Sequence, residues 1–250
     1  MAADKVLIVT GGGRGIGAAT ALLAAERGFA VCVNFLRDRD SASSLVRTIS
    51  GKGGRAIAVQ ADVSVEDEVG RIFEETDSKL GKVTALVNNA GIVDRGIRVE
   101  QVTAARIARM FAINVTGSFL CAREAVKRMS TRHGGAGGAI VNVSSIAAKL
   151  GGAGEYVDYA ASKGAIDTFT VGLAKEVGAE GIRVNAVRPG IIRTEIHASS
   201  GDPARLERIG ATAPLGRPGE PDEVARAILW LLSDEASYLS GALVDVSGGR

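Results

Sequence analysis

Cysteine and histidine are scarce in this chain, which leaves little material for covalent or metal cross-links. The 250 residues include only 2 cysteines and 2 histidines. Cys32 lies in an apolar, strand-like run and Cys121 in a helical pattern, so we predict two buried thiols and a reducing compartment. His133 sits beside a glycine-rich loop and His197 follows a Pro-Gly pair, and neither has a partner at metal-ligand spacing. We therefore expect no disulfide framework and no metal site.

The chain also lacks a strong charge imbalance and a long hydrophobic run. Its formal net charge is +2, too small to indicate binding to nucleic acid or to a membrane surface. No apolar run approaches the roughly 20 residues of a membrane span. The N-terminus, MAADKVLIVT, enters a strand-like run at once, so no signal peptide is expected. We predict a cytoplasmic globular protein, since 46% hydrophobic residues can build a large core.

Glycine is abundant, with 33 residues against 5 prolines. The glycines follow no fixed period, which excludes a repeat or collagen-like architecture. They cluster at the ends of apolar runs instead. This pattern indicates many tight turns between strands and helices.

Short apolar runs alternate with helical patterns along the chain. The strand-like runs are Val6–Thr10, Ala30–Phe35, Ala56–Gln60, Ala85–Val87, Ala139–Val143, Arg183–Val187 and Ala242–Val246. The helical patterns are Ala18–Arg27, Ser41–Gly51, Val65–Leu80, Val102–Met129, Tyr156–Val177 and Asp222–Leu232. Strands without polar alternation are buried on both faces, and alternation with helices indicates parallel βαβ units. With no linker or composition break, we predict one doubly wound (Rossmann) α/β domain over residues 1–250, with a parallel seven-stranded sheet and helices on both faces.

The first predicted strand leads into a glycine-rich turn, TGGGRGIG, from Thr10 to Gly17. A turn of this kind before a helix binds a pyrophosphate through backbone N–H groups and the helix dipole. The common fingerprint fits only as Gly13-x-Gly15-x-x-Ala18, and a tight turn without a ligand is the alternative. The spacing Thr10-Gly11-x-x-x-Gly15-x-Gly17 is more informative.

Further motifs follow this turn in a fixed order. They are NNAG (Asn88–Gly91), Asn114, NVSS (Asn142–Ser145), Tyr159-x-x-x-Lys163 and Pro189-Gly190-x-x-x-Thr194. With them the chain resembles the short-chain dehydrogenase/reductase family over its whole length. The ordered set is highly specific, although each motif alone is modest. The resemblance implies a cofactor site mainly in residues 1–120 and a catalytic and substrate region mainly in residues 140–216.

Two of the three tyrosines lie in one stretch, EYVDYAASKGA. In a helix Tyr159 and Lys163 are one turn apart, whereas Tyr156 is about 10 Å from Lys163 along the axis. A cation within about 4–6 Å lowers a phenol pKa by about 1–3 units. We therefore expect Tyr159 to exchange a proton near neutral pH, and Tyr156 to pack or to line the substrate site.

The family resemblance assigns roles to four residues. Tyr159 would donate a proton to the substrate carbonyl, and Lys163 would lower the tyrosine pKa and hydrogen-bond the nicotinamide ribose. Ser145 would hold the carbonyl oxygen, and Asn114 would hold a water in a proton relay. The 14 residues from Ser145 to Tyr159 exceed the usual spacing by about one, so Ser144 stays open as the alternative serine.

Cofactor choice is expected at the end of the second strand, where a carboxylate would favour NAD and a cation NADP. Phe35 takes the place of the acid, and Arg37 and Arg14 favour NADP(H), while Asp38 leaves NAD(H) possible. The cofactor-binding residues implied by the resemblance are Gly11, Arg14, Gly15, Ile16, Gly17, Phe35, Arg37, Asp62, Val63, Asn89, Ala90, Gly91, Tyr159, Lys163, Pro189, Gly190, Ile192 and Thr194.

The substrate is predicted to be a small polar carbonyl compound or alcohol, such as a sugar or polyol. The resemblance places a substrate lid over residues 197–216, and its segment DPARLERIG is highly charged. A 3-oxoacyl-(acyl-carrier-protein) reductase is one alternative, with the basic residues Arg123, Lys127, Arg128 and Arg132 as a candidate carrier patch. A non-catalytic nucleotide-sensing protein is the other.

The resemblance also implies a homotetramer, with a dimer as the next choice. The expected contacts are the long helices and the C-terminal strand region. Small residues along the catalytic helix would allow a neighbour to approach closely: Ala160, Ala161, Gly164, Ala165 and Gly172. Close packing of that helix on its own sheet is the alternative explanation.

Overall fold

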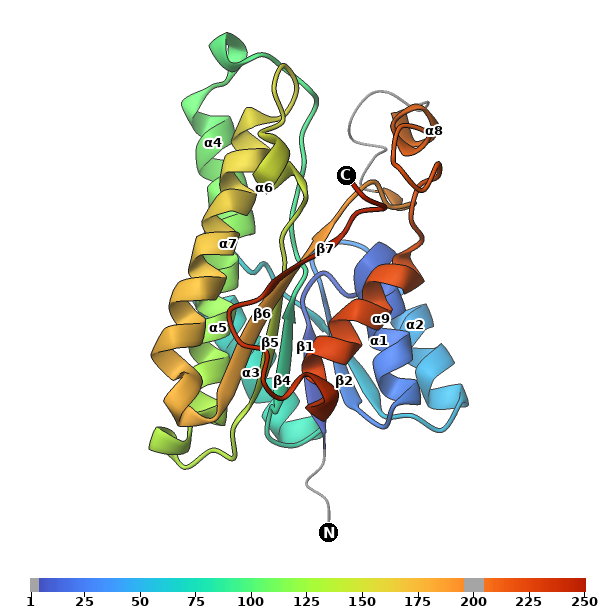
Figure 1. Ribbon diagram of the computed structural model, residues 1–250. Coiled ribbons are helices and arrows are strands. Elements are labelled where there is room, and N and C mark those ends of the chain that lie inside the picture. The colour runs from blue at the N-terminus through green and yellow to red at the C-terminus, as the bar shows by residue number, and fades with distance from the viewer. Residues whose placement is uncertain (1–4, 196–204) are drawn as a thin grey trace.

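A twisted sheet of seven parallel strands forms the centre of the protein in the computed structural model, which describes residues 5–195 and 205–250 (Figure 1). The strands are β1 (Val6–Val9), β2 (Ala30–Phe35), β3 (Ala56–Gln60), β4 (Ala85–Asn88), β5 (Gly138–Val143), β6 (Ile182–Pro189) and β7 (Leu243–Val246). Their order is β3-β2-β1-β4-β5-β6-β7, and every neighbouring pair is parallel. The order reverses between β1 and β4, so the predicted doubly wound sheet is confirmed. The predicted residue His197 lies outside the described residues.

Helices cover both faces of the sheet (Figure 1). One face carries α1 (Gly15–Glu26), α2 (Arg39–Gly51) and α9 (Pro221–Leu232). The other carries α3 (Glu66–Lys79), α4 (Ala104–Phe111), α5 (Gly117–Met129) and α7 (Val157–Val177). Short elements complete the chain: η1 (Val99–Gln101), η2 (Ala112–Thr116), η3 (Thr131–His133), α6 (Ala147–Leu150), η4 (Gly178–Glu180), α8 (Arg205–Gly210) and η6 (Asp234–Ala236).

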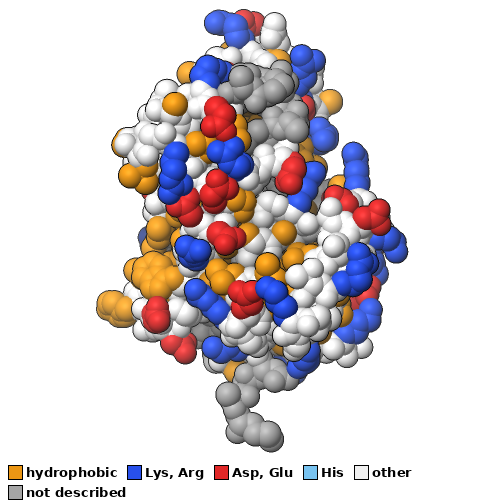
Figure 2. Space-filling model, turned by 90° about the vertical axis from the view of Figure 1, so that its right-hand side faces the viewer, with side chains coloured by type: hydrophobic (Ala, Val, Ile, Leu, Met, Phe, Trp, Pro, Cys, Tyr) orange, Lys and Arg blue, Asp and Glu red, His pale blue; other side chains and the backbone are white. Residues whose placement is uncertain are grey.

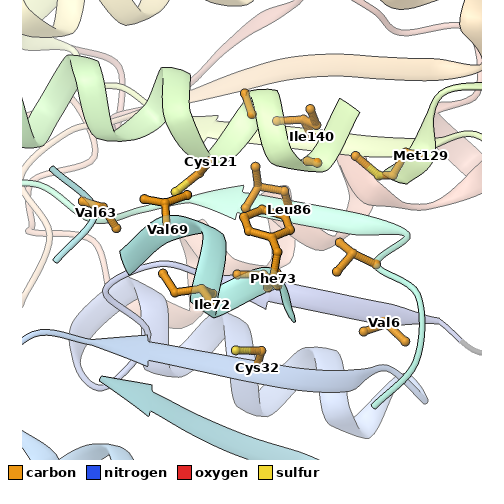
Figure 3. Packing of buried hydrophobic residues seen from close by; sticks show 14 of the residues in the cluster. Val6, Cys32, Val63, Val69, Ile72, Phe73, Leu86, Cys121, Met129 and Ile140 are labelled. Carbon is orange, nitrogen blue, oxygen red and sulfur yellow. The ribbon is translucent and has the colours of Figure 1, made fainter. Parts of the chain in front are cut away.

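Alternate residues of each strand supply two separate hydrophobic cores. In β1, Val6 and Ile8 join the cluster under α3 and α5, whereas Leu7 and Val9 join the cluster under α1 and α9. Successive strand side chains point to opposite faces, and here both faces are covered. Figure 3 shows part of the first cluster, where side chains of several strands meet those of α3 and α5. The carboxyl ends of the strands are thereby fixed relative to one another.

The long helix expected over Val102–Met129 is observed from Ala104 to Met129, but it is not a uniform α-helix. A π-helical turn, η2, separates α4 from α5, and it contains Asn114. A π turn inserts an extra residue into the helix and re-aims the side chains beside it, and such turns are frequent at functional sites. Simple helical periodicity does not report an insertion of this kind.

Both cysteines are fully buried, as predicted. Cys32 and Cys121 are 0% exposed, and burial raises the pKa of each thiol to about 12. Among residues 5–195 and 205–250, no helix combines the length and apolar character needed to cross a membrane. Within the same ranges no three His, Cys, Asp or Glu side chains are grouped as metal ligands.

Candidate active site

The glycine-rich loop joins β1 to the N-terminus of α1. Gly11 and Gly15 have φ values of +59° and +53°, a region that side chains strongly disfavour. A Cβ on Gly17 would lie 2.5 Å from the carbonyl oxygen of Gly11, so the loop can close only around glycine. The three glycines therefore match the tight turn that the sequence predicts.

The start of α1 suits an anionic ligand. No side chain caps this helix, and its first turn contains no acidic residue. The first N–H groups of a helix have no partner within the helix, and the helix dipole favours negative charge beside them. The backbone N–H groups of Gly15, Ile16 and Gly17 are therefore the groups that could hold the pyrophosphate of a dinucleotide.

Three polar side chains brace this loop, and the sequence analysis singled out Thr10 and Asn89 but not Asn34. The Thr10 hydroxyl accepts hydrogen bonds from the N–H groups of Asn89 and Ala90, both at 3.0 Å. The Asn89 amide donates to the carbonyls of Thr10 and Gly11 at 2.9 and 3.0 Å. Asn34 accepts from the Gly11 N–H at 3.2 Å. Asn34 is a buried polar residue in an apolar strand, which is the signal that could have identified it.

Ser145, Tyr159 and Lys163 meet beyond the carboxyl end of β5. Tyr159 and Lys163 lie one turn apart on α7, and the side chains of Ser145 and Tyr159 share a hydrogen bond. The Lys163 ammonium donates to the Val143 carbonyl at 2.7 Å and lies 5.8 Å from the centre of the Tyr159 ring. Ser144 is different, since its buried hydroxyl donates to the Lys163 carbonyl at 3.1 Å. Only the second serine of the pair faces the tyrosine.

The electrostatics of Tyr159 differ from the expectation. Burial raises the pKa of the phenol, and its hydrogen bond with Ser145 only partly opposes this effect. Burial also lowers the pKa of Lys163, to about 8. The predicted lowering of the tyrosine pKa by the lysine is therefore wrong, because desolvation of the buried phenol has the largest effect on its pKa.

Asn114 braces the loop that follows β4. Its Oδ1 accepts from the Ile92 N–H at 2.8 Å, and its Nδ2 donates to the Ile92 carbonyl at 3.0 Å and to Ser162 at 3.1 Å. A Cβ on Gly91 would lie 3.3 Å from the Asn114 Oδ1 and 3.6 Å from the Lys163 ammonium. Asn114 and Lys163 thus face the same glycine. The water relay proposed for Asn114 stays a prediction.

A buried ion pair fixes the first turn of α7, and the sequence analysis missed it. Asp158 accepts from the Tyr159 N–H at 2.9 Å and from Arg106 Nε at 2.6 Å. Arg106 also donates to the Arg95 carbonyl at 2.8 Å. The Asp158 side chain is 4% exposed and the Arg106 side chain is 11% exposed. The pair joins α4, α7 and the loop after β4, and 52 residues separate its members in sequence.

Tyr156 lies just before α7 and is buried. A Cβ on Gly96 would lie 3.6 Å from its ring and hydroxyl. The neighbouring backbone is also joined, since the Ile97 N–H donates to the Glu155 carbonyl at 2.9 Å. Tyr156 therefore packs against the loop that follows β4, which agrees with the packing role left open for it.

The residues expected to choose the cofactor lie at the end of β2, in the turn that follows it and in the glycine-rich loop. Phe35 is buried, whereas Arg14 and Arg37 are exposed and form no ion pair within the described residues. Asp38 caps α2, accepting from the Ser41 N–H at 3.0 Å and the Ser41 hydroxyl at 2.7 Å. These hydrogen bonds lower the Asp38 pKa, and Arg14 lowers it further. Both carboxylate oxygens are thus committed to the helix cap.

The remaining predicted cofactor contacts lie around the same edge of the sheet. Asp62 accepts from the N–H and hydroxyl of Ser64 at 2.9 and 2.7 Å, and Val63 is buried. Beyond β6, Gly190 packs against Ser247, and Ile192 is buried. A Cβ on Gly15 would lie 3.1 Å from the Thr194 methyl. The segment after Pro189 therefore reaches back to the glycine-rich loop.

A cavity of about 530 Å³ opens on the other side of this segment. It is lined by the segment after β6, by residues 213–219 and by the C-terminal residues 245–250. Ser145, Tyr159 and Lys163 do not line it. The cavity thus borders the site without containing its proton-exchanging groups.

Comparison with known proteins identifies the family. The family model described as enoyl-(acyl carrier protein) reductase matches residues 11–250. The chain is 55% identical over 245 residues to the uncharacterized oxidoreductase YgfF of Escherichia coli, covering 98% of this chain and 99% of that protein. It is 38% identical to versicolorin reductase 1 of Dothistroma septosporum, covering 98% and 95% of the two chains.

A solved structure agrees with both comparisons. The blue fluorescent protein from a metagenomic library, in complex with NADPH, superimposes with a TM-score of 0.89 at 35% identity, covering 98% of this chain and 97% of that one. Sequence and fold therefore match over almost the full length. The chain belongs to the short-chain dehydrogenase/reductase family of oxidoreductases.

Proposed function

We propose that the protein transfers a hydride between a nicotinamide cofactor and a carbonyl or secondary alcohol of a small polar molecule, such as a sugar or polyol. One arrangement carries the proposal: the hydrogen-bonded pair of Ser145 and Tyr159 lies one helical turn from the buried Lys163. The glycine-rich loop lies at the same edge of the sheet. A site for a dinucleotide and a proton donor are thus brought together.

In the reducing direction Tyr159 is the proton donor. When bound, the nicotinamide supplies the hydride. The carbonyl oxygen then gains negative charge, which the Ser145 hydroxyl stabilises by hydrogen bonding. The phenol of Tyr159, whose raised pKa keeps it protonated at neutral pH, gives its proton to this oxygen. In the oxidising direction the phenolate takes the proton back.

Lys163 stabilises the phenolate that this transfer leaves. Its ammonium is buried, is held by the Val143 carbonyl and lies one turn from Tyr159. In such a poorly solvated site an attraction between charges is stronger than in water. Asn114 supports the group indirectly by fixing the loop that carries Gly91.

A carrier-bound acyl substrate is the second candidate, because the matching family model is named for an acyl carrier protein reductase. The basic residues considered for carrier binding give it little support. Arg123, Lys127 and Arg128 pair with acidic residues of α3 or α5, and Arg132 pairs with Glu180. Their charge is largely neutralised within the protein, which favours a free small molecule.

A substrate panel tests the proposal. Sugars, polyols, aldehydes, ketones and acyl thioesters are offered with each nicotinamide cofactor, and turnover is followed at the nicotinamide absorbance. We expect turnover of small polar carbonyl compounds or alcohols. Selective turnover of acyl thioesters would favour the carrier-bound substrate, and cofactor binding without any turnover would favour a nucleotide sensor.

The same site supports a preference for NADP(H). Asp38 is occupied in capping α2, whereas Arg14 and Arg37 are exposed and form no ion pair with any described residue. A guanidinium group binds a phosphate through strong charge-assisted hydrogen bonds. The side chains at this position therefore suit the 2′-phosphate of NADP(H) better than the free hydroxyl of NAD(H).

We expect NADPH to bind more tightly than NADH, and Arg37→Ala to reduce the difference by about 2 kcal/mol, or roughly 30-fold. Direct titration of both cofactors at low salt measures the two affinities. Arg47→Ala is the matched control, since Arg47 is also exposed but lies within α2, farther from the turn that carries Arg37. Equal affinities for the two cofactors in the wild-type protein would contradict the preference.

Exposed apolar side chains support the proposal of a homotetramer. Ile107, Phe119 and Val157 are 43%, 47% and 39% exposed on α4, α5 and α7. Trp230 and Tyr238 are 38% and 103% exposed near β7, the last strand of the sheet. Figure 2 shows hydrophobic side chains gathered at the lower left of the face it displays. Surfaces of this kind suit contacts between subunits.

The glycines of α7 favour the same conclusion. A Cβ on Gly164 or Gly172 would meet no atom within 4 Å. Close packing on the protein's own sheet therefore does not explain these two glycines. Ala160 does lie in the interior, so the intramolecular explanation holds at that position.

Light scattering at micromolar concentration is expected to give about four times the 25.7 kDa chain mass. Gly172→Glu should halve this mass or reduce it further, because a charge would be buried in the interface while the isolated helix gains propensity. Gly70→Glu on α3, where a Cβ also meets open space, should leave the mass unchanged. A stable, active wild-type monomer would refute the tetramer.

A further inference from the structure

A buried carboxylate follows the two proton-exchanging residues along α7. Tyr159, Lys163 and Asp167 are spaced four residues apart, so they form one stripe along the helix. Asp167 is only 7% exposed. A carboxylate is almost never buried to this degree without a partner of opposite charge, so its surroundings call for an explanation.

Arg188 holds this carboxylate from the neighbouring strand. Its Nε and Nη2 both lie close to Asp167 Oδ2, at 2.9 and 2.8 Å. The second oxygen, Oδ1, is buried and forms no hydrogen bond within the part of the chain that the structure describes. Arg188 directly precedes the Pro189-Gly190 pair of the predicted cofactor site. The ion pair thus joins the catalytic helix to β6.

The positive charge of Arg188 is shared with a second carboxylate. Its Nη1 lies 3.5 Å from Asp245 on β7, and Asp245 also pairs with Lys149. The Arg188 and Asp167 side chains are 12% and 10% exposed, whereas those of Asp245 and Lys149 are 31% and 50% exposed. The field of Asp167 is therefore only partly cancelled by its arginine, and it can act on neighbouring groups.

The other groups around the Lys163 ammonium are mostly uncharged. The Val143 carbonyl of β5 accepts its hydrogen bond, the Asn114 amide of η2 lies across Gly91, and Tyr159 is a protonated phenol. The nearby cation is Arg188 of β6, which pairs with Asp167 rather than with the lysine. Asp167 favours the protonated form of Lys163, whereas burial opposes it and lowers the pKa to about 8.

We propose that Asp167 is a positioning residue for Lys163, and that its carboxylate, held by Arg188, keeps the lysine charged inside the site at neutral pH. The proposal rests on the role of Lys163 in the proposed function. An uncharged amine would leave the phenolate of Tyr159 without its counter-charge. Asp167 would then contribute to proton transfer without touching the substrate.

The test follows the charge of Lys163 directly. Protein labelled with ¹³C at the lysine ε-carbons is titrated by NMR, and the signal that is absent in Lys163→Arg identifies Lys163. Asp167→Asn keeps the shape of the side chain and removes its charge, and it should move the titration midpoint of Lys163 down by about one pH unit. Asp167→Glu, which restores the charge, should return the midpoint toward the wild-type value.

Arg188→Gln tests the direction in which the Lys163 midpoint shifts. This variant also keeps the proposal testable if Asp167→Asn fails to fold. Removing the cation leaves the field of Asp167 uncancelled, so the Lys163 midpoint should rise. A loss of packing alone would not lower the Lys163 midpoint in Asp167→Asn and raise it in Arg188→Gln. A folded Asp167→Asn protein with an unchanged midpoint, or a midpoint that does not rise in Arg188→Gln, would overturn the proposal.

The pH dependence of enzyme activity is an independent test of the effect of Asp167 on proton transfer. In Asp167→Asn the basic limb of the pH profile for alcohol oxidation should move to lower pH together with the NMR midpoint. A fixed limb beside a shifted midpoint would overturn the link between Asp167 and proton transfer. If no substrate is turned over at all, the proposed function fails, whereas the titration still decides whether Asp167 sets the charge of Lys163.

Discussion

Replacement of Tyr159 by phenylalanine is expected to lower kcat by about 10³-fold, the usual contribution of a positioned acid or base. The change removes one oxygen, and with it the hydrogen bond to Ser145 and the transferable proton. The ring remains, so the packing of α7 is preserved. Because the dinucleotide is expected to be held mainly by the glycine-rich loop, cofactor affinity should change little.

Tyr156→Phe is the matched control. It makes the same chemical change three residues earlier on the chain, at a buried side chain that packs against Gly96. Substantial activity should remain in this variant. Steady-state kinetics with the best substrate of the panel, and titration of the cofactor into each variant, measure both effects. An inactive Tyr156→Phe beside an active Tyr159→Phe would reverse the two roles.

The sheet could be predicted from sequence because its signals are local. Each buried strand is a short apolar run, and the seven predicted runs lie within two residues of the observed strand boundaries. The contiguous motifs were predictable for the same reason. A glycine turn and a Tyr-x-x-x-Lys pair need only the geometry of one loop or one helix. The family resemblance assigned Ser145 rather than Ser144, and only the structure shows which of the two hydroxyls turns toward Tyr159.

Other features of the site depend on contacts between distant segments. The Arg106–Asp158 pair spans 52 residues and the Arg188–Asp167 pair spans 21. No periodicity connects such positions. The direction of the Tyr159 pKa shift was mispredicted for a related reason. The helix spacing shows that Lys163 is near, but not how far burial by the rest of the fold shifts both groups.

Replacement of Lys163 by methionine is expected to make protein stability depend differently on pH. Burial lowers the Lys163 pKa to about 8 in the folded protein, from 10.5 for a free lysine side chain. Between these values the unfolded chain binds a proton that the folded protein does not. The stability of the wild-type protein therefore rises with pH across this window, relative to a variant without the amine.

The expected size follows from the two pKa values. The shift of the Lys163 pKa from 10.5 to about 8 corresponds to about 3 kcal/mol of unfolding free energy. Below pH 8 this whole amount destabilises the folded protein. Methionine has a similar length and no charge, but it leaves the Val143 carbonyl without its hydrogen bond, at a cost of about 1–3 kcal/mol. That cost does not depend on pH. A change with pH in the stability difference between the wild-type and methionine proteins therefore reports only the charge of Lys163.

Urea unfolding of both proteins at pH 7 and pH 10, at equal concentration and without cofactor, measures this change. The difference in unfolding free energy should move by about 2.5 kcal/mol in favour of the wild-type protein at the higher pH, since pH 10 lies just below the pKa of the unfolded lysine. A difference that stays constant would mean that Lys163 is not desolvated. At pH 7 the methionine variant should be inactive yet no less stable, because the wild-type protein keeps a buried charge that opposes folding and that, under the proposed function, is retained for proton transfer and cofactor binding.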